Sequence, residues 1–583
     1  MATPNQKLAA ALEKLRQLQA DGSRVFASAQ LTRTARERLL KHGFLQEVMR
    51  GWLISSSPTV QPGDTTPWFA SLWEFCRRYC DDLFAQAWHL SPEQSLLLHA
   101  ADTAIPKQVI IYSPAANNNR VDLLFDTSLF ALKTQTMPAE RDLELHHGLR
   151  VFRVEAALTR VPDGFFSDHP VEAQVVLGRI REPSELLARL LAGGHTVIAG
   201  RLAGSFRHLG QAAIADEIVA TMKAADHAVR ETDPLEAAPA AAPAPRSTSP
   251  IVARLHTLWA TSRDAVLAEL PRAPGLPRDR AGYLRRIDDT YRLDAYHSLS
   301  IEGYQVTPEL VQRVASGGWD PDEQPADRDN ANALAARGYW LAFRRAREAV
   351  RRILDSAGDI ELLRSAHRDW YREMFSPHVA AGIFDASLLA GYRTHPVYLR
   401  GSRHVPPRSE VLREAMPALF DLIEAEPAPA VRAVLGHWLL GYIHPFPDGN
   451  GRIARLLMNT LLAGGGYPWT VIRVDDRAEY LAALETASVA SDVRPFAKFI
   501  ARQVRRAKPT RKRKTRSPRT STSRPGTSRS RSSNQASAPP RLSLQPRRRR
   551  ARRDVLADLL VTRSSRPTAR QAADRRRARS RSR

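Results

Sequence analysis

The sequence predicts a multidomain protein with an N-terminal α/β region, a mainly α-helical region and a disordered basic tail. Three observations predict this division of the 583 residues. Residues 231–250 are rich in Ala and Pro without an apolar period, as in an extended linker. Residues 251–506 contain long amphipathic helical patterns and few strand candidates. Residues 507–583 are rich in Arg, Ser and Pro and bury too little apolar area to fold.

The positive charge is concentrated in the tail. The chain has a formal net charge of +25, but residues 508–583 hold 26 of its 86 Lys and Arg and only 3 of its 61 Asp and Glu. The rest of the chain, with 60 basic and 58 acidic residues, is almost neutral. The tail could bind nucleic acid or another polyanion through counterion release. A solvated appendage and the product of a frameshift are the alternatives.

Cysteine usage and hydropathy favour a soluble cytoplasmic protein. Cys76 and Cys80 are the only cysteines, and no second Cys/His pair is spaced to complete a zinc site. We interpret them as two packed thiols in a reducing compartment. The N-terminus lacks an apolar signal core, and no run of about 18 apolar residues occurs. No membrane partner is therefore expected.

Residues 1–230 form the predicted N-terminal region, whose basic helix and hairpin suggest a winged helix-turn-helix. Residues 27–55 read as a basic helix followed by a strand–turn–strand pattern about Arg50 and Gly51. With the mixed helical and β-rich pattern that follows, residues 1 to about 225 resemble the AbiEi-type antitoxins and transcriptional regulators. The resemblance implies a helix in the DNA major groove and a wing on phosphate. The candidate DNA-binding residues are Arg33, Arg36, Arg38 and Arg50. The alternative is a basic surface helix that aids solubility or binds a protein.

The α-helical region contains the stretch HPFPDGNGRIAR at residues 444–455. Apolar residues at helical spacing precede it, and Pro445 and Pro447 forbid a continued helix. A second helical pattern follows and stops at Gly464–Gly466. The sequence therefore predicts a helix–loop–helix connection in which DGNG lies at the N-terminus of the second helix.

Each residue type in this stretch has a use around a phosphate. A helix N-terminus attracts anions, and Gly449 and Gly451 allow close backbone approach. Arg452 and Arg455 share a helix face and can fork onto phosphate oxygens. Asp448 offers a hard oxygen to Mg²⁺, and His444 can accept a proton near neutral pH. The alternative is a polar interhelical loop with helix caps and surface ion pairs. No Walker loop occurs in the chain.

The stretch resembles the Fic motif, H-P-F-x-(D/E)-G-N-G-R-x-x-R, at all nine specified positions. The resemblance extends from about residue 280 to 503 and implies a mainly helical Fic domain with a β-hairpin flap. It also implies transfer of AMP from ATP, with Mg²⁺, onto a Ser, Thr or Tyr hydroxyl of a target protein. The flap lies in YRTHPVYLRGSRHVPP, residues 392–407, and would pair with an extended target segment by main-chain hydrogen bonds.

The resemblance also implies a role for each site residue. His444 would be the catalytic base and Asp448 the Mg²⁺ ligand, while Phe446 would anchor the loop in the core. Arg455 would bind the γ-phosphate, and Tyr480 and Ser488 would face adenine, although Asn is frequent where Ser488 stands. The complete set of implied ATP-binding residues is Gly449, Asn450, Gly451, Arg452, Arg455, Gly401, Ser402, Arg403, His404, Tyr480 and Ser488.

The stretch YHSLSIEGYQVT, residues 296–307, fits the inhibitory pattern of the same family, (S/T)-x-x-x-E-(G/N). Ser298 and Glu302 supply its specified side chains. A carboxylate that pairs with Arg455 would take the place of the γ-phosphate, so the resemblance implies autoinhibition from a helix N-terminal to the motif. Some similar proteins use this Glu to remove AMP from targets, and that activity stays open. The alternative is a solvated helix end.

Two hypotheses about function follow. The first is an autoinhibited protein adenylyltransferase whose N-terminal region recognises DNA or the target. The second is a DNA-binding transcriptional regulator or antitoxin-like protein in which the Fic domain senses nucleotide. Intact His444 and Asp448 favour the first. The target protein, a nucleotide donor other than ATP and a homodimer are left open by the sequence.

Overall fold

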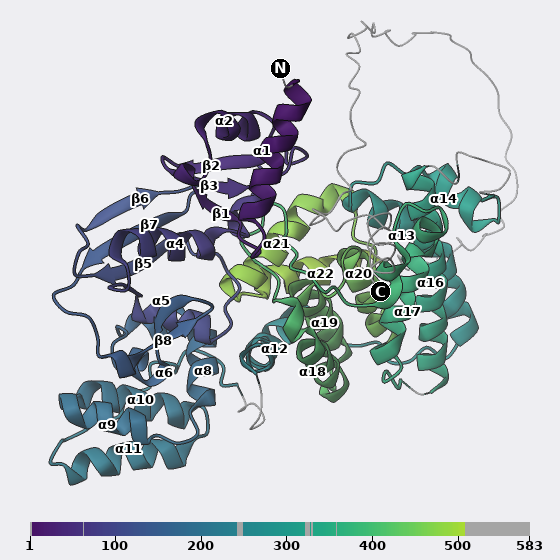
Figure 1. Ribbon diagram of the computed structural model, residues 1–583. Coiled ribbons are helices and arrows are strands. Elements are labelled where there is room, and N and C mark those ends of the chain that lie inside the picture. Colours follow the sequence, from purple (N-terminus) through teal and green to yellow (C-terminus); the bar gives the residue numbers. More distant parts are fainter. Residues whose placement is uncertain are drawn as a thin grey trace, which may run out of the picture. The chain divides into compact units, whose positions relative to one another are not determined.

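The computed structural model describes residues 3–61, 63–241, 249–320, 327, 330–356 and 358–507 (Figure 1). Residues 1–507 form one compact unit. The N-terminal region and the helical region therefore belong to the same body. The predicted basic tail from residue 508 and residues 242–248 of the predicted linker lie outside the described residues.

The first part of the N-terminal region has the order of elements expected for a winged helix. Its elements are α1 (Pro4–Leu18), β1 (Val25–Ala27), η1 (Ser28–Gln30), α2 (Arg33–Lys41), β2 (Leu45–Met49) and β3 (Trp52–Ser55). The Thr32 hydroxyl accepts from the Ala35 N–H and so caps α2. The strands form an antiparallel sheet in the order β1-β3-β2. Gly51, with φ of 94°, makes the turn of the predicted β2–β3 hairpin.

A second, mixed part follows in the chain. It contains α3 (Thr66–Phe69), α4 (Leu72–Phe84), β4 (His89–Leu90), α5 (Pro92–His99), β5 (Gln108–Ser113), β6 (Asn119–Asp122), β7 (Ser128–Lys133), η2 (Glu140–Asp142), β8 (Leu143–His146) and β9 (Leu149–Phe152). One sheet has the order β4-β5-β7-β6, with β5 and β7 parallel, and β8 pairs with β9. Cys76 and Cys80 are free and fully buried on α4, and burial raises the pKa of the Cys76 thiol to about 12. They are packed thiols, as expected.

The N-terminal region ends in short helices. They are α6 (Val154–Leu158), α7 (Gly164–Asp168), α8 (Pro170–Arg179), α9 (Ser184–Gly193), α10 (Thr196–His208) and α11 (Ala212–Ala224). Helix α12 (Pro250–Glu269) packs against α8 and also against helices of the following region, so it joins the two regions. Its Arg254 is buried and donates hydrogen bonds to Glu172 on α8 and to the Tyr442 hydroxyl, at 2.8 Å each.

Among the described residues, the helical region shares the largest hydrophobic core with helices α5 to α11 of the N-terminal region. Its helices are α13 (Arg280–Ile301), α14 (Pro308–Ala315), α16 (Ala331–Asp355), α17 (Leu363–Ala380), α18 (Leu412–Ala425), α19 (Pro429–Ile443), α20 (Asn450–Gly464), α21 (Arg477–Ala490) and α22 (Arg494–Ala507), with short turns η3 (Ala386–Ala390), η4 (Ser409–Val411) and η5 (Val474–Asp476). Helices α16 and α17 approach closely at Gly338, where a Cβ would lie 1.9 Å from the Met374 carbonyl oxygen. Helices α19 and α20 pack as the predicted helix–loop–helix pair.

The predicted β-hairpin flap is wrong. Residues 391–408, all of which are described, contain no strand and only one isolated bridge, from His404 to Ala104 of the N-terminal region. The segment turns at residues 399–402, where the Ser402 N–H donates to the Leu399 carbonyl. Prolines at 396, 406 and 407 lack the N–H groups that a hairpin ladder requires, which explains why the segment does not pair with itself.

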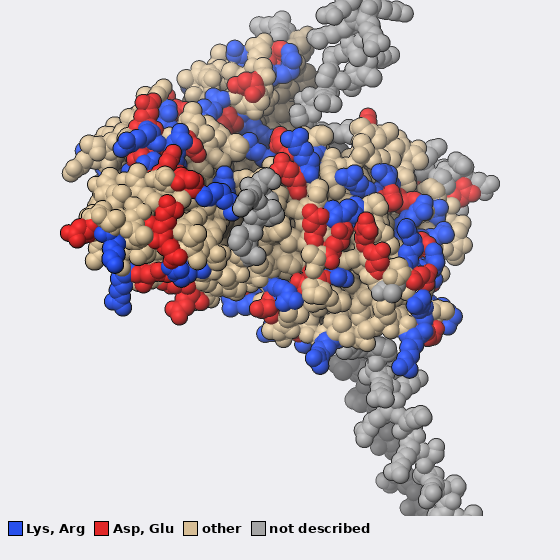
Figure 2. Space-filling view, turned by 90° about the horizontal axis from the view of Figure 1, so that it is seen from below, with Lys and Arg blue, Asp and Glu red and all other residues tan. Residues whose placement is uncertain are grey.

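Among the described residues, no helix is long and apolar enough to cross a membrane. Figure 2 shows basic and acidic side chains interspersed over one face of the molecule. This mixture agrees with the near-neutral balance of the chain outside the tail.

Candidate functional site

The candidate site is built on the loop between α19 and α20. Helix α19 ends at Ile443, and His444 adopts a left-handed backbone conformation with φ of 51°. This conformation is uncommon for a residue with a side chain, so the surroundings must hold it. The His444 N–H donates to Leu440, and its carbonyl oxygen accepts from Arg393 at 2.8 Å.

Arg393 is a positioning residue that the sequence reasoning missed. Its guanidinium is buried and donates to four main-chain carbonyls, those of His395, Pro407, Ile443 and His444. Burial lowers the pKa of Arg393 to about 10, which leaves it charged at neutral pH. One side chain thereby joins the predicted flap segment to the loop between α19 and α20. An arginine fork is suited to several fixed acceptors at once.

The His444 imidazole is prepared to accept a proton. Its Nδ1 lies 3.2 Å from the Gly441 carbonyl oxygen, which can only accept, so Nδ1 carries the hydrogen and Nε2 is left basic. Burial lowers the pKa of His444 to about 4, although the Gly441 carbonyl and nearby carboxylates oppose the shift. The ring is therefore neutral at physiological pH.

The N-terminus of α20 has the geometry of an anion site. Gly449 is the N-cap with φ of 77°, and a Cβ there would lie 2.8 Å from the Phe375 ring. A Cβ on Gly451 would lie 2.5 Å from the Glu302 carboxylate. Gly449 is thus required both by its positive φ and by close packing, whereas Gly451 leaves room for the Glu302 carboxylate.

The Asn450 side chain holds the shape of the loop. Its Oδ1 accepts from the Phe446 N–H, and its Nδ2 donates to the Phe446 carbonyl, each at 2.8 Å. Both ends of the side-chain amide are thus bonded to the loop, and its contact with phosphate stays a prediction. Asn450 therefore fixes the loop shape, with Phe446 fully buried as expected.

Arg452 is the strongest indication of an anionic ligand. It is 1% exposed, and its Nε and Nη1 have no hydrogen-bond partner in the described part of the chain. Its Nη2 lies 3.3 Å from the Asp448 carboxylate, and the rings of Tyr304 and Phe375 each lie 5.2 Å from its guanidinium carbon. Buried donors without acceptors are costly, and an anion at the end of α20 would satisfy them.

Arg455 is occupied by the candidate inhibitory pair. Its Nη2 donates to the Glu302 carboxylate at 2.7 Å and to the Ser298 carbonyl at 2.9 Å, and its Nε donates to the Ser298 hydroxyl. Burial would raise the pKa of Glu302, but the charges of Arg455 and Arg452 outweigh it and lower that pKa. The Glu302 side chain keeps 30% of its surface exposed, so it can be displaced.

The residues of the flap segment that were predicted to contact the nucleotide form hydrogen bonds with other parts of the chain. The Gly401 N–H donates to Thr65, and the Ser402 hydroxyl bonds to Glu485 on α21. The Arg403 guanidinium donates to the Ile105 carbonyl. His404 is buried, with Nδ1 on the Thr103 hydroxyl and Nε2 on the Tyr442 carbonyl. In this conformation these polar atoms have partners within the chain, and their contact with ATP stays a prediction. Their position facing the N-terminal region could not be read from the motif.

Tyr480 and Ser488 also direct their polar atoms into the core. The Tyr480 hydroxyl bonds to His437, and the Ser488 hydroxyl accepts from the Trp438 indole, at 2.8 and 3.1 Å. Both partners lie on α19. These bonds fix both side chains against α19, and the expectation that the two positions face adenine stays a prediction.

The described residues contain no group of three or more His, Cys, Asp or Glu that could hold a metal ion by themselves. Asp448 is the one carboxylate next to both His444 and Arg452 in the motif, and its side chain is 36% exposed. A single hard oxygen donor fits Mg²⁺ where substrate phosphates and water supply the other ligands.

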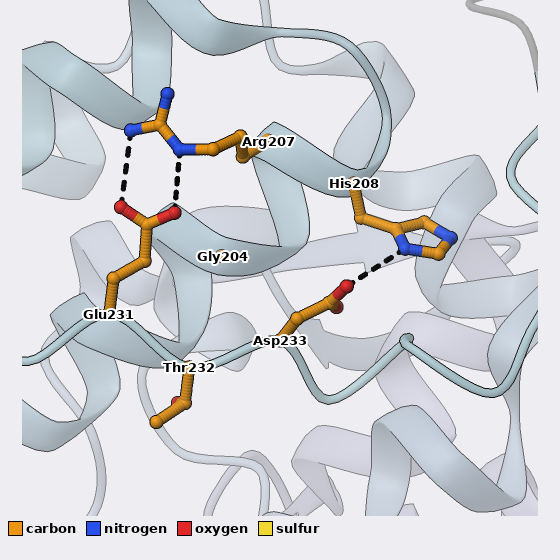
Figure 3. Close-up of a pocket in the computed structure, with 6 residues that line it drawn as sticks. All are labelled: Gly204, Arg207, His208, Glu231, Thr232 and Asp233. Carbon is orange, nitrogen blue, oxygen red and sulfur yellow. Dashed lines mark hydrogen bonds and ion pairs between the residues drawn. The ribbon is translucent and has the colours of Figure 1, made fainter.

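The candidate DNA-binding residues lie together on α2 and the following hairpin. Arg33 pairs with Glu37 at 2.8 Å, and Arg38 donates to the Lys7 carbonyl. Arg50 is exposed at the hairpin turn, and Arg36 is half-buried on α2. A surface pocket elsewhere, between α10 and residues 231–233, is lined by paired charges, Arg207 with Glu231 and His208 with Asp233 (Figure 3). It shares no residue with the site.

Comparisons with known proteins show which family the segment around this site matches. Residues 358–462 match the model of the Fic/DOC family, so this segment is a Fic domain. A protein adenylyltransferase Fic from Nematostella vectensis is 46% identical over 115 residues, which cover 19% of this chain and 26% of that protein. The Drosophila willistoni protein of the same name is 30% identical over 258 residues, 44% of this chain and 47% of that protein.

The chain thus spans less than half the length of these two curated relatives. Among solved structures, a fragment of Fic-1 from C. elegans aligns with 57% of this chain and 94% of its own, at 21% identity and a TM-score of 0.33.

Proposed function

We propose that the chain is a protein adenylyltransferase that transfers AMP from ATP to a hydroxyl of a target protein. The observation that carries the proposal is Arg452, a buried arginine with two donor nitrogens that lack partners in the described structure, at the N-terminus of α20. Phosphate oxygens would satisfy both donors and the free amides of the helix. The curated relatives carry the same name for this activity.

In the proposed reaction, Nε2 of His444 takes the proton of the target hydroxyl. The oxygen then forms a bond to the α-phosphorus, and the bond from that phosphorus to the bridging oxygen of the β-phosphate breaks. AMP is left on the target, and pyrophosphate leaves. The neutral imidazole and its oriented Nδ1–H support this role for His444. Asp448 would hold Mg²⁺, which would neutralise charge on the α- and β-phosphates.

We further propose that Glu302 and Ser298 inhibit the enzyme by competition for Arg455. The 2.7 Å ion pair occupies the guanidinium that would otherwise bind the γ-phosphate. The Glu302 carboxylate also lies against the N-terminal turn of α20, because a Cβ on Gly451 would be only 2.5 Å from it. ATP could then bind only in a pose that does not react.

AMP transfer by the Glu302→Gly variant tests both proposals. With α-labelled ATP and Mg²⁺, this variant should label protein at least about tenfold faster than the wild type, because an arginine is released for the γ-phosphate. Asp289→Ala is a matched control, since it removes an exposed carboxylate from the same helix. Mass spectrometry of the labelled residue would identify the acceptor. Loss of all labelling in Glu302→Gly would contradict the inhibitory role.

A second candidate function concerns the N-terminal region. The order of α2, β2 and β3 favours DNA binding, with α2 in the major groove and Arg50 on a phosphate. A gel-shift assay with the full chain and random duplex DNA tests this function. Binding that weakens as salt rises and in Arg36→Ala/Arg50→Ala would support it. Identical binding by that variant would exclude the wing from the contact.

A further inference from the structure

The target-binding edge of the flap is covered by the chain's own N-terminal region. Residues 399–406 are the part of the predicted flap segment 392–407 that lies beside the N-terminal region, and they are called the flap below. The Val405 N–H donates to the Thr103 carbonyl at 2.9 Å, and the Ile105 N–H donates to the Arg403 carbonyl at 2.8 Å. These two bonds flank the antiparallel bridge between Ala104 and His404. Residues 103–105 thus lie along the flap in the geometry of an added strand.

The main-chain N–H groups of residues 401–405 of the flap are all satisfied within the chain. The N–H groups of Gly401 and Val405 donate to the N-terminal region, at Thr65 and Thr103. Ser402 donates to Leu399 and His404 to the Ser402 hydroxyl. Arg403 donates to Glu485 at 2.8 Å. An incoming strand that pairs at Arg403 and Val405 must replace residues 103–105.

Side chains reinforce the pairing. The Arg403 guanidinium donates to the Ile105 carbonyl, and Arg400 lies 3.4 Å from the Asp64 carboxylate. The Thr103 hydroxyl is bonded to both His404 and Tyr442. Tyr442 lies two residues before His444, and its hydroxyl also accepts from the buried Arg254. The contact therefore reaches the end of the helix that carries the catalytic base.

We propose that residues 103–105 act as an internal occupant of the target site, so that a target protein binds only after this segment and the flap separate. The proposal rests on the proposed adenylyltransferase function. It adds a second level of control that is independent of Glu302, because Glu302 obstructs the nucleotide and residues 103–105 obstruct the target. The segment is not itself placed as an acceptor, since its one hydroxyl, on Thr103, is tied to His404 and Tyr442.

The contacts are of a kind that a target can exchange. They consist of two main-chain hydrogen bonds and a few polar side-chain contacts, each of modest net strength, between half-buried residues 103, 104, 403 and 405 and the buried Ile105 and His404. An extended target would re-form the main-chain bonds one for one, so its sequence is constrained little by the flap itself. Among the described residues, the flap has no strand partner other than Ala104, so these two main-chain bonds are the only ladder bonds that a target strand must replace.

A reversible cross-link tests the proposal. Ala104 and His404 form a non-hydrogen-bonded antiparallel pair, whose Cα separation of about 4.5 Å suits a disulfide. The full chain with Glu302→Gly would carry Ala104→Cys/His404→Cys, and the native Cys76 and Cys80 are buried. Ala104→Ser/His404→Ser in the same background is the matched control, since it also lacks the His404 imidazole but cannot be locked.

Two readouts are compared before and after reduction. Calorimetry should give MgATP affinities within about twofold for the oxidised and reduced forms. AMP transfer to a synthetic extended peptide of alternating Val and Thr should fall at least about tenfold on oxidation and return on reduction, while the control is insensitive to reductant. Equal transfer by the two forms would overturn the proposal. Loss of MgATP binding in both forms would instead contradict the proposed function.

Hydrogen exchange gives an answer even if the disulfide does not form or the peptide is not modified. In the Glu302→Gly chain, the amides of Ile105 and Val405 should exchange together and at least about a hundredfold faster than those in the middle of α19. Fast joint exchange of these two amides would show that the contact between residues 103–105 and the flap opens without global unfolding. Exchange of both amides as slow as that of α19 would show that the contact is a permanent part of the core and would overturn the proposal.

Discussion

At the scale of residues, the site is a neutral base next to an unsatisfied cation. His444 keeps Nε2 available because Nδ1 donates to Gly441, and Arg452 keeps two donors available because nothing in the described chain accepts from them. Arg455, by contrast, is saturated by Glu302 and Ser298. The two arginines of one helix face are thus in opposite states, one ready for a ligand and one occupied.

The His444→Ala variant should lose AMP transfer. Removal of a general base typically lowers a rate by about 10² to 10⁴. Because the imidazole makes no contact that the arginines need, MgATP affinity measured by calorimetry should change little. His42→Ala, which removes an exposed histidine next to α2, is the control. Unchanged transfer by His444→Ala would show that another group takes the proton.

The rate of AMP transfer should not change around neutral pH through protonation of His444. The pKa of His444 is lowered to about 4 by burial, so the ring is neutral and active at every pH above roughly 5. The rate should fall only as pH drops toward 4, where the ring becomes protonated. Stopped assays from about pH 5 to 8 in the Glu302→Gly chain check this. An acid limb centred near 6.5 would mean that His444 is not desolvated.

At the scale of elements, the site depends on how the α19–α20 connection is held. Helix α19 ends in a left-handed residue, Asn450 clamps the loop back on Phe446, and Arg393 joins the loop to the flap. The shape of the loop is thus determined by contacts with Arg393, about 50 residues away in the chain.

Arg393→Lys should lower the rate without an equal loss of nucleotide affinity. A lysine keeps the charge but cannot serve several carbonyls with a fixed fork, so His444 loses its orientation. We expect kcat for AMP transfer to fall at least about tenfold while the Kd for MgATP changes less. Arg352→Lys, an exposed change on α16, is the control. A fall in affinity as large as that in kcat would place Arg393 in nucleotide binding instead.

The sequence predicted the local features of this element well and the distant ones poorly. Helical periodicity, Pro445 and the glycines predicted the helix–loop–helix connection, because all of these effects act within a few residues. Ser298 and Glu302 were predicted as partners of Arg455 only because their spacing resembles a pattern of the Fic family. The contacts of Arg393 and His404 were not predicted, because each depends on a tertiary contact that no local pattern encodes. The flap was predicted as a hairpin, but its pairing partner lies about 300 residues away.

At the scale of the whole molecule, the N-terminal region and the Fic domain share one body. Arg254 on α12 is buried between them, bonded to Glu172, Asp102 and Tyr442. Burial alone would lower the pKa of Arg254, but these partners raise it, so the guanidinium stays charged. Separation of the two regions would leave this buried charge without its partners, which is strongly destabilising. We therefore expect the two regions to unfold together.

The folded chain should lose stability as pH falls below about 6.5. Burial lowers the pKa of several histidines, among them His367 and His378 to about 4 and His404 and His437 to about 3. The unfolded chain binds protons near the ordinary pKa of 6.5, so stability is full above that value and is lost progressively below it. Each such histidine costs about 1.4 kcal/mol per pH unit in this window.

Thermal unfolding at about pH 7 and pH 5 measures this effect. The Tm should be lower at pH 5 by several degrees or more. Replacement of His437 by Gln, which keeps a polar group of similar size, should make the difference between the two values smaller. The same Tm at both pH values would show that these rings are not neutral and buried in the folded chain.

The most direct test of the central claim is calorimetric titration of MgATP into the full chain with Glu302→Gly. The account predicts binding at the N-terminus of α20, in the micromolar to millimolar range usual for enzyme substrates. It also predicts that binding is weaker when Arg452 is replaced by Lys, which cannot fork onto two oxygens. No heat of binding from a folded Glu302→Gly chain would mean that the loop at residues 444–455 does not hold a nucleotide, and would contradict the account.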